Sequence, residues 1–278
     1  MNPTVIITGA TGSMGSAAVR QMAAQGFDVV LACRNTRRGE DLKNELLSES
    51  PDGVQLHVMM LDLSSLVSVK SFANKIGAYV HAGKIHLVGL FNNAGTMNRH
   101  YSLTDDGLEN DMAVNCVGAY VLTRCLLPYF APDACVVDMV SVTCHINRLH
   151  ADFLHEPANR FRQLPVYGRS KLALLLSAVA LSQHLHELGR PDLHINVADP
   201  GVVDTHIITM DRWFDSLADV VFRPLIKRPE QGVAPALKAL VSDKRLYYFV
   251  GKKARPIRQH YLHHPFIEEV WNALESFV

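Results

Sequence analysis

The chain has 278 residues, 48% of them hydrophobic, and its 27 basic and 27 acidic residues leave a formal net charge of zero. A chain of this size and apolar content can bury a sizeable α/β core, which excludes a disordered protein. The balanced charge does not favour nucleic acid or an anionic membrane surface as a main partner.

Cysteine usage and apolar runs predict a cytoplasmic protein. The five cysteines include no C-x-x-C pair and are expected to be reduced thiols. The sequence contains no run of eighteen uncharged apolar residues, so we expect no transmembrane helix. The first apolar run is too short for a signal-peptide core. The spacings of His184 with His186 and of His263 with His264 place no two rings on one helix face, so we expect no metal site.

Short apolar runs alternate with longer amphipathic runs along the whole chain. In chain order, the pattern predicts a strand at 4–8, a helix at 14–25, a strand at 29–33, a helix at 37–49, a strand at 54–61 and a helix at 66–80. The alternation continues with a strand at 85–92, a helix at 108–129, a strand at 135–140, a helix at 166–188, a strand at 193–198, a helix at 229–241 and a strand at 247–250.

This alternation predicts the fold class. Apolar strands separated by helices are typical of parallel strands buried on both faces, and right-handed crossovers then give a doubly wound sheet. We expect a single Rossmann-like α/β domain over residues 1–278, with about seven strands flanked by helices. The segment 206–228, rich in Ile, Met, Trp, Phe and Val, breaks the pattern after a strand, where a substrate loop or lid would lie.

The first predicted strand runs directly into a glycine-rich stretch at residues 8–15, Thr-Gly-Ala-Thr-Gly-Ser-Met-Gly, and a predicted helix follows. Glycines at such a turn let the backbone approach a pyrophosphate, and the helix N-terminus supplies N–H groups and the positive end of its dipole. The stretch therefore predicts a dinucleotide-binding loop. A tight structural turn without a ligand is the alternative interpretation.

The end of the second predicted strand indicates which dinucleotide binds. An acidic residue there would bind the ribose 2′-hydroxyl of NAD, whereas an arginine would accept the 2′-phosphate of NADP. This chain has Arg34 at that end and no Asp or Glu. Because a guanidinium matches a phosphate through paired hydrogen bonds, we expect NADP(H), with Arg37 and Arg38 able to assist. An ordinary solvated arginine is the alternative.

Tyr167 and Lys171 open a long predicted helix, lie four positions apart and project from one face. A free tyrosine titrates near pH 10, and a nearby ammonium lowers that pKa, which suits proton transfer to or from a carbonyl oxygen. Ser141 follows a predicted strand, and its hydroxyl could hold a substrate oxygen for Tyr167. Taken singly, a surface tyrosine beside a lysine and a serine in a turn are the ordinary interpretations.

Seven pieces in a fixed order give a resemblance to a known family. They are the loop at 8–15, Asp62-Leu63, the Asn-Asn-Ala-Gly run at 92–95, Asn115, Ser141, the pair Tyr167 and Lys171, and the Pro-Gly-Val-Val-Asp-Thr run at 200–205. With them the sequence resembles the short-chain dehydrogenases/reductases over nearly its whole length. The stretches 32–35, 62–66 and 228–232, and the 26-residue interval from Ser141 to Tyr167, look like the retinol-dehydrogenase-like branch. The insert at 150–164 would line the substrate mouth.

The resemblance implies a role for each matched residue. Tyr167 would be the general acid/base, Lys171 would lower its pKa and bind the nicotinamide ribose, Ser141 would orient the substrate oxygen, and Asn115 would support a proton relay. The cofactor would be bound by Tyr167 and Lys171 together with Gly9, Thr11, Ser13, Met14, Gly15, Arg34, Asn35, Asp62, Leu63, Asn93, Ala94, Gly95, Pro200, Gly201, Val203 and Thr205. A homodimer or homotetramer paired through the two long helices is also implied.

The cofactor loop departs from the family pattern. The usual loop has a glycine at position 13, where this chain has Ser13 preceded by Gly12. The resulting Thr-Gly-x-x-Gly-x-x-Gly pattern is that of extended members with a larger C-terminal substrate domain. This chain has little room for such a domain, which favours the compact single-domain interpretation.

The expected function is an NADP(H)-dependent oxidoreductase that interconverts the alcohol and carbonyl forms of a lipophilic hydroxy or keto substrate, such as a steroid, retinoid or ketone. Two alternatives stay open: a dinucleotide-binding sensor or scaffold without catalysis, and an extended-type nucleotide-sugar epimerase or dehydratase, which only Gly12 suggests. Aromatic and basic residues at 212–228 resemble an interfacial amphipathic stretch. A substrate lid explains them without a further partner, so membrane contact is not favoured.

Overall fold

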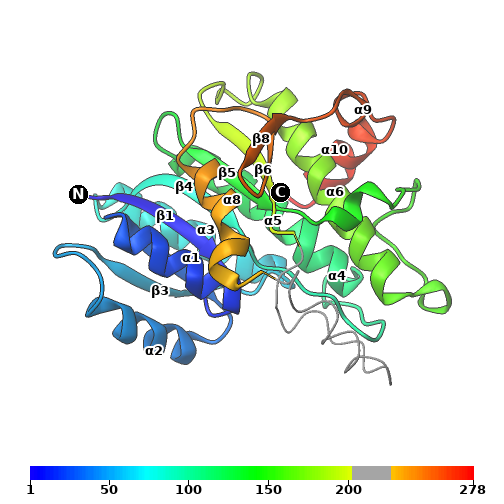
Figure 1. The fold of residues 1–278 in the computed structure, drawn as a ribbon. Coiled ribbons are helices and arrows are strands. Elements are labelled where there is room, and N and C mark those ends of the chain that lie inside the picture. The colour runs from blue at the N-terminus through cyan, green and yellow to red at the C-terminus, as the bar shows by residue number, and fades with distance from the viewer. Residues whose placement is uncertain (202–226) are drawn as a thin grey trace.

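The centre of the fold is one sheet, which has eight strands in the computed structural model of residues 1–201 and 227–278 (Figure 1). The strands are β1 (Pro3–Thr8), β2 (Asp28–Cys33), β3 (Leu56–Met60), β4 (His86–Asn92), β5 (Cys135–Met139), β6 (His194–Asp199), β7 (Tyr247–Val250) and β8 (Lys253–Pro256). They lie in the order β3-β2-β1-β4-β5-β6-β7-β8, and only β7 and β8 pair antiparallel. The predicted doubly wound, Rossmann-like sheet is confirmed.

Helices cover both faces of the sheet (Figure 1). They are α1 (Ser13–Ala24), α2 (Thr36–Leu47), α3 (Leu66–His81), α4 (Asn110–Met112), α5 (Gly118–Leu126), α6 (Gln163–His184), α8 (Pro229–Leu240), α9 (Gln259–Leu262) and α10 (Ile267–Glu275). Buried residues of α1 and α8 form an apolar core on one face, and those of α3, α5, α6 and α10 form a larger core on the other. Burial on both faces explains the nearly continuous apolar runs of β1 and β2.

The C-terminal part of the chain adds elements that the sequence did not predict. β8 pairs with β7 at the sheet edge and has the sequence Lys-Ala-Arg-Pro with mostly exposed side chains. An edge strand without an apolar face lacks the alternation by which strands are predicted. The short helix α9 and the helix α10 were also missed, although Ile267, Val270 and Leu274 give α10 an apolar face at helical spacing.

The predicted helix at 108–129 is interrupted. It consists of α4, a π-helical turn at Ala113–Val117, α5, and a 3₁₀ turn at Leu127–Tyr129. π-Helical turns are rare and occur mostly as single turns within α-helices, frequently at functional sites. Asn115 is the middle residue of this turn, so the irregularity falls on a residue that the sequence singled out.

Helix α10 packs on the outer side of α5 and α6. The Trp271 ring stacks on the His184 ring with 3.9 Å between centroids. Glu275 accepts hydrogen bonds from Tyr120 Oη at 2.7 Å and from Arg124 Nε at 2.6 Å. The face on which the sequence predicts pairing of two subunits is therefore in contact with α10 of the same chain.

Helix α6 is, among the described residues, the one helix long and apolar enough to cross a membrane. However, 78% of its most apolar 18-residue window is buried inside the fold. Its apolar residues, including Leu172–Leu176, belong to the core that packs against the sheet. The length and composition of α6 are therefore those of a core helix.

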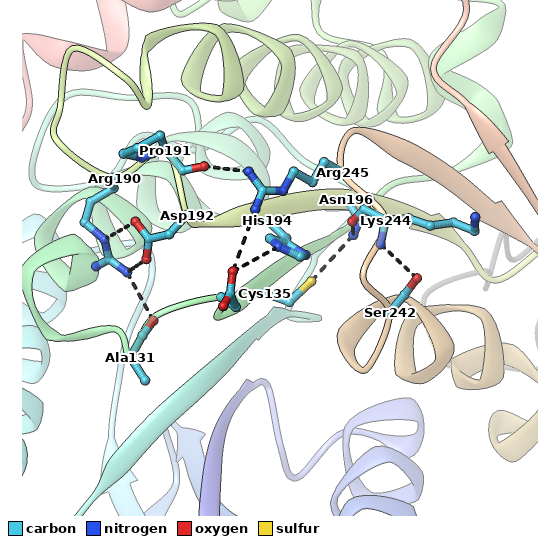
Figure 2. A network of polar contacts seen from close by, with 11 residues as sticks. Ala131, Cys135, Arg190, Pro191, Asp192, His194, Asn196, Ser242, Lys244 and Arg245 are labelled. Atoms are coloured by element: carbon cyan, nitrogen blue, oxygen red, sulfur yellow. Dashed lines mark hydrogen bonds and ion pairs between the residues drawn. The ribbon is translucent and has the colours of Figure 1, made fainter.

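The amino ends of β5, β6 and β7 are held together by a polar network (Figure 2). Arg190 donates to Asp192 and to the carbonyl oxygens of Leu127 and Ala131. Arg245 donates to the carbonyl oxygen of Pro191 at 2.6 Å, which joins the loop before β7 to the loop before β6. These contacts lie at the amino ends of the strands. Ligands of such folds bind at the opposite, carboxyl ends.

Candidate functional site

A cleft of about 500 Å³ opens at the carboxyl ends of β1 to β4, where the strand order reverses between β1 and β4. Ligands of open α/β sheets bind at such a reversal. Predicted cofactor residues that line the cleft are Gly9, Thr11, Ser13, Met14, Gly15, Arg34, Asn35, Asp62, Leu63, Asn93, Ala94 and Gly95. Gly12, which belongs to the predicted loop at 8–15, lines the cleft as well, and so do Asn98, Asn110 and Val114, which were not predicted.

The glycine-rich turn at one end of the cleft leaves room for a ligand against the backbone. Gly9 has a φ of +64°, which L side chains rarely adopt, and a Cβ on Gly15 would lie 2.1 Å from the carbonyl oxygen of Gly9. Gly12 precedes α1 as its N-cap and offers no side chain to the free N–H groups of the first turn. Because Ser13 begins α1 at the cleft, a pyrophosphate fits this helix end.

The end of β2 forms the other side of the cleft. Asn35 caps α2 by accepting a hydrogen bond from the backbone N–H of Arg38 at 3.0 Å. Arg34 and Arg38 are exposed and both line the cleft, so two guanidinium groups lie at this end. Two such groups suit a phosphate ester rather than an uncharged hydroxyl.

The loop after β4 links the cleft to the predicted catalytic residues. Asn93 Nδ2 donates to the carbonyl oxygen of Thr8 at 2.8 Å, and the N–H of Ala94 donates to Thr8 Oγ1 at 3.0 Å. A Cβ on Gly95 would lie 3.2 Å from Asn115 Oδ1 and 3.2 Å from Lys171 Nζ. The glycine therefore permits the close approach of this loop to both side chains.

Asn115 is fully buried in the π-helical turn and has all of its amide groups bonded. Its Oδ1 accepts from the N–H of Thr96 at 2.8 Å, and its Nδ2 donates to the carbonyl oxygen of Thr96 at 2.8 Å and to Ser170 Oγ at 2.9 Å. The side chain thus ties the loop after β4 to the start of α6, three residues beyond Tyr167.

The structure brings Ser141, Tyr167 and Lys171 together at the carboxyl end of β5. Ser141 Oγ accepts from the N–H of Thr143 at 3.3 Å, and its hydroxyl lies near enough to Tyr167 to act on the pKa of that tyrosine. Lys171 Nζ donates to the carbonyl oxygen of Met139 at 2.9 Å and lies 6.0 Å from the centroid of the Tyr167 ring. The lysine is thereby fixed between β5 and the tyrosine.

Burial dominates the electrostatics of this group. It raises the pKa of Tyr167 to about 12, although the hydrogen bond from Ser141 acts in the opposite direction. Burial also lowers the pKa of Lys171 to about 8, against the attraction of Asp138. In the protein alone, the tyrosine pKa therefore lies above its ordinary value, whereas the sequence led us to expect a lowered one.

Two buried carboxyl groups near Lys171 were not predicted. Asp111 accepts hydrogen bonds from the backbone and side chain of Asn98, and burial raises its pKa to about 7. Asp138 accepts from Asn92 Nδ2 at 2.8 Å, and burial raises its pKa to about 6. Neither residue belongs to a motif, and only folding brings them near the lysine.

The turn after β6 holds the remaining predicted cofactor residues that the structure describes. The N–H of Gly201 donates to Asp199 Oδ1 at 2.7 Å, and Lys227 Nζ donates to the carbonyl oxygen of Pro200 at 2.9 Å. Val203 and Thr205, and residues 206–226 of the predicted lid at 206–228, lie outside the described residues. Within the described residues, no cluster of three His, Cys, Asp or Glu side chains could hold a metal ion.

Residues 3–213 match a family described as short chain dehydrogenase. Similar proteins include short-chain dehydrogenase TIC 32 B, chloroplastic, of Brassica napus (34% identity over 73% of this chain and 65% of its own length) and polyprenol dehydrogenase of Mus musculus (35%, 82% and 68%). Retinol dehydrogenase 12 of Mus musculus is 32% identical over 86% of this chain and 73% of its own length. The chain thus spans about two thirds of the length of these relatives.

Two solved structures show the same fold. An uncharacterised protein from Mycobacterium Paratuberculosis superposes with a TM-score of 0.79 at 27% identity, over 99% of this chain and 92% of its own. A short-chain dehydrogenase from Sphingobium yanoikuyae in complex with NADPH superposes with a TM-score of 0.65 at 22% identity, over the same shares of the two chains.

Proposed function

The chain belongs to the short-chain dehydrogenase/reductase family, with relatives among the retinol dehydrogenases, and on this premise we propose that it is an NADP(H)-dependent oxidoreductase. Its substrate would be the alcohol or carbonyl form of a lipophilic small molecule. The observation that supports this most strongly is the meeting of Ser141, Tyr167 and Lys171 beside Gly95, at the inner end of the cleft.

When bound in the cleft, NADP(H) would supply or accept the hydride of the proposed reaction. Tyr167 gives its hydroxyl proton to the carbonyl oxygen during reduction and takes it back during alcohol oxidation. Ser141 donates a hydrogen bond to the same oxygen and holds it for Tyr167. Lys171, fixed by the Met139 carbonyl oxygen, presents its ammonium to the tyrosine and to the cofactor ribose, and Asn115 keeps the adjoining loop in place.

The preference for NADP(H) rests on the end of β2. Arg34 and Arg38 line the cleft there, and both would contact the 2′-phosphate. The NADPH-bound neighbour, and a second one with bound NADP, have the same fold, which supports a dinucleotide in this cleft. Asp62, Leu63 and Asn35 would contact the adenosine half, and the turns at 9–15 and 93–95 the phosphates and the nicotinamide half.

The substrate class rests on the relatives and on the predicted lid. Retinol and polyprenol, in the names of two relatives, are both long apolar alcohols, which supports a lipophilic substrate. We propose that residues 150–164 and 206–228 form the substrate mouth and lid of a single cofactor-binding domain. The predicted homodimer or homotetramer stays a prediction, and the contact of α10 with α5 and α6 leaves less of that face free. The cytoplasmic location gains no support, since one relative is chloroplastic by name.

The decisive experiment is Tyr167→Phe, assayed with NADPH and a panel of retinoids, steroids and small ketones. The variant should lose turnover by several orders of magnitude and bind NADPH as the unaltered chain does, because only the proton donor is removed. Tyr101→Phe, in the loop after β4, serves as the control. Turnover of Tyr167→Phe at the unaltered rate would refute the mechanism, and tight NADPH binding without turnover of any substrate would favour a sensor or scaffold.

Cofactor preference is tested by Arg34→Ala. Losing a guanidinium partner of the 2′-phosphate should weaken NADPH binding by about 1.5–3 kcal/mol and leave NADH binding nearly unchanged. Binding constants for both dinucleotides, measured by fluorescence titration, give the ratio. Equal losses for NADPH and NADH would contradict the assignment of Arg34 to the 2′-phosphate.

A further inference from the structure

Four polar side chains from four separate elements form a continuous chain beside Ser141. Asp199 ends β6, Tyr248 lies in β7, His145 ends the 3₁₀ turn Val142–His145 that Ser141 caps, and Tyr261 lies in α9. Tyr248 Oη donates to Asp199 Oδ2 at 2.8 Å, His145 Nε2 lies 3.1 Å from Tyr248 Oη, and His145 Nδ1 lies 2.6 Å from Tyr261 Oη. No motif in the sequence connects these residues.

The donors and acceptors of this chain can be arranged in only one direction while Asp199 is a carboxylate and His145 is neutral. A carboxylate only accepts, so the single hydroxyl proton of Tyr248 goes to Asp199. The Tyr248 oxygen then accepts from His145 Nε2–H, and His145 Nδ1 accepts from the Tyr261 hydroxyl. Burial and the nearby Arg258 and His260 lower the pKa of His145, against the pull of Asp199, which keeps the ring neutral at pH 7.

The chain ends on the turn that follows β6. The second oxygen of Asp199 accepts from the N–H of Gly201, whose φ is +75°, and Lys227 Nζ holds the carbonyl oxygen of Pro200. This turn lies beside the site because the N–H of Val140, next to Ser141, donates to the carbonyl oxygen of Ala198 at 2.9 Å. Asp199 is also near enough for its charge to oppose ionisation of Tyr167 and raise the pKa of that tyrosine.

We propose that Tyr261, His145, Tyr248 and Asp199 are positioning residues, an oriented hydrogen-bond chain that fixes the turn 199–201 for binding of the nicotinamide half of the cofactor. The proposal rests on the proposed function, because it takes the dinucleotide as the ligand of the adjoining cleft. When the turn 199–201 is already ordered, cofactor binding does not have to spend free energy on ordering it. The hydrogen-bond chain therefore increases the affinity for the cofactor. It also joins helix α9 to the site through side chains alone.

The first test compares Tyr248→Phe with Tyr247→Phe in the full chain. Successive strand residues face opposite sides of the sheet, so Tyr247 does not take part in the hydrogen-bond chain. Tyr247 is half-buried, as Tyr248 is, and is therefore a matched control. Tyr248→Phe leaves Asp199 Oδ2 and His145 Nε2 without their partner and should weaken NADPH binding about tenfold, which corresponds to about 1.4 kcal/mol. Tyr247→Phe should bind NADPH as the unaltered chain does. Unchanged binding in Tyr248→Phe, or equal losses in both variants, would overturn the proposal.

The second test reads the chain directly and needs no cofactor. In ¹⁵N-histidine NMR of the ligand-free protein at pH 7, His145 should be the neutral tautomer that carries its proton on Nε2. His145→Gln, whose amide can donate to Tyr248, should retain more NADPH affinity than His145→Leu. The proposal of an oriented hydrogen-bond chain would be overturned by a proton on His145 Nδ1, by a doubly protonated ring, or by equal NADPH affinities of the two variants. Failure of the unaltered protein to bind any dinucleotide would instead refute the proposed function, and the positioning role with it.

Discussion

Replacing the buried Asp111 tests how much a buried charge near Lys171 lowers the free energy of unfolding. The carboxyl group is fully buried and accepts from Asn98 through the backbone N–H at 3.0 Å and through Nδ2 at 2.8 Å. Burial raises its pKa from an ordinary 3.8 to about 7, with Glu109 acting in the same direction and Lys171 in the opposite one. Replacing Asp111 by Asn removes the charge and keeps an oxygen that can accept from Asn98.

The sign and size of the effect follow from proton linkage. Folded Asp111 binds its proton more tightly than unfolded Asp111, so the protein loses stability as the pH rises from about 4 to about 7, and the loss is complete above that range. Each pKa unit is worth about 1.4 kcal/mol, which sets an upper limit of about 4 kcal/mol on the whole loss. About two of the three units fall between pH 5 and pH 8.5, so the advantage of Asp111→Asn should grow by nearly 3 kcal/mol over that interval.

Urea unfolding at pH 5 and at pH 8.5 measures this difference. The free energy of unfolding of Asp111→Asn should exceed that of the unaltered chain much more at pH 8.5 than at pH 5. Asp105→Asn, an exposed carboxylate in the preceding loop, is the control and should differ from the unaltered chain equally at both pH values. A difference for Asp111→Asn that does not change with pH would refute the reasoning.

Four further substitutions test the cleft, the π-helical turn and the end of the sheet opposite to the cleft. Gly15→Ala would place a Cβ 2.1 Å from the Gly9 carbonyl oxygen, so unfolding should become easier by about 1–3 kcal/mol and fluorescence titration should show weaker NADPH binding. Asn115→Leu leaves the half-buried backbone N–H and carbonyl groups of Thr96 without their Asn115 partner, so urea unfolding should show a loss of about 1–3 kcal/mol, with slower turnover. Arg190→Ala removes the guanidinium donor from Asp192 and from the carbonyl oxygens of Leu127 and Ala131, and should lower stability by about 2 kcal/mol in urea unfolding. The half-exposed Arg245→Ala should cost clearly less in the same assay.

The fold could be predicted from the sequence wherever strands are buried on both faces. The run at 4–8 and the run at 29–33 are apolar because helices cover both sides of β1 and β2, and that burial is what a hydrophobicity pattern records. The hairpin strand β8 has one neighbour and exposed side chains, so it left no such pattern. The π-helical turn could not be predicted either, because its residues are as apolar as those of an ordinary helix and only the hydrogen bonding differs.

The site was predictable to the extent that its residues lie in short motifs. The turn 8–15 and the spacing of Tyr167 and Lys171 depend on local geometry, which residue types and intervals reveal. The residues that shift the pKa values of the site or hold its turns in place do not lie in such motifs. Asp138 and Lys171 are 33 positions apart, and the chain from Tyr261 to Asp199 joins four elements. Such neighbours are set by the order of strands in the sheet, which single motifs do not contain.

The buried charges explain why Tyr167 and Lys171 cannot be understood as an isolated pair. A lysine with a pKa lowered to about 8 by burial still carries a proton at neutral pH, because Asp138 and Asp111 favour its charged form. Burial raises the pKa of each of these carboxyl groups, and Lys171 in turn favours their charged forms, so the charges of the lysine and the two acids are coupled. The ammonium that faces the tyrosine therefore depends on β5 and α4 as much as on its position in α6.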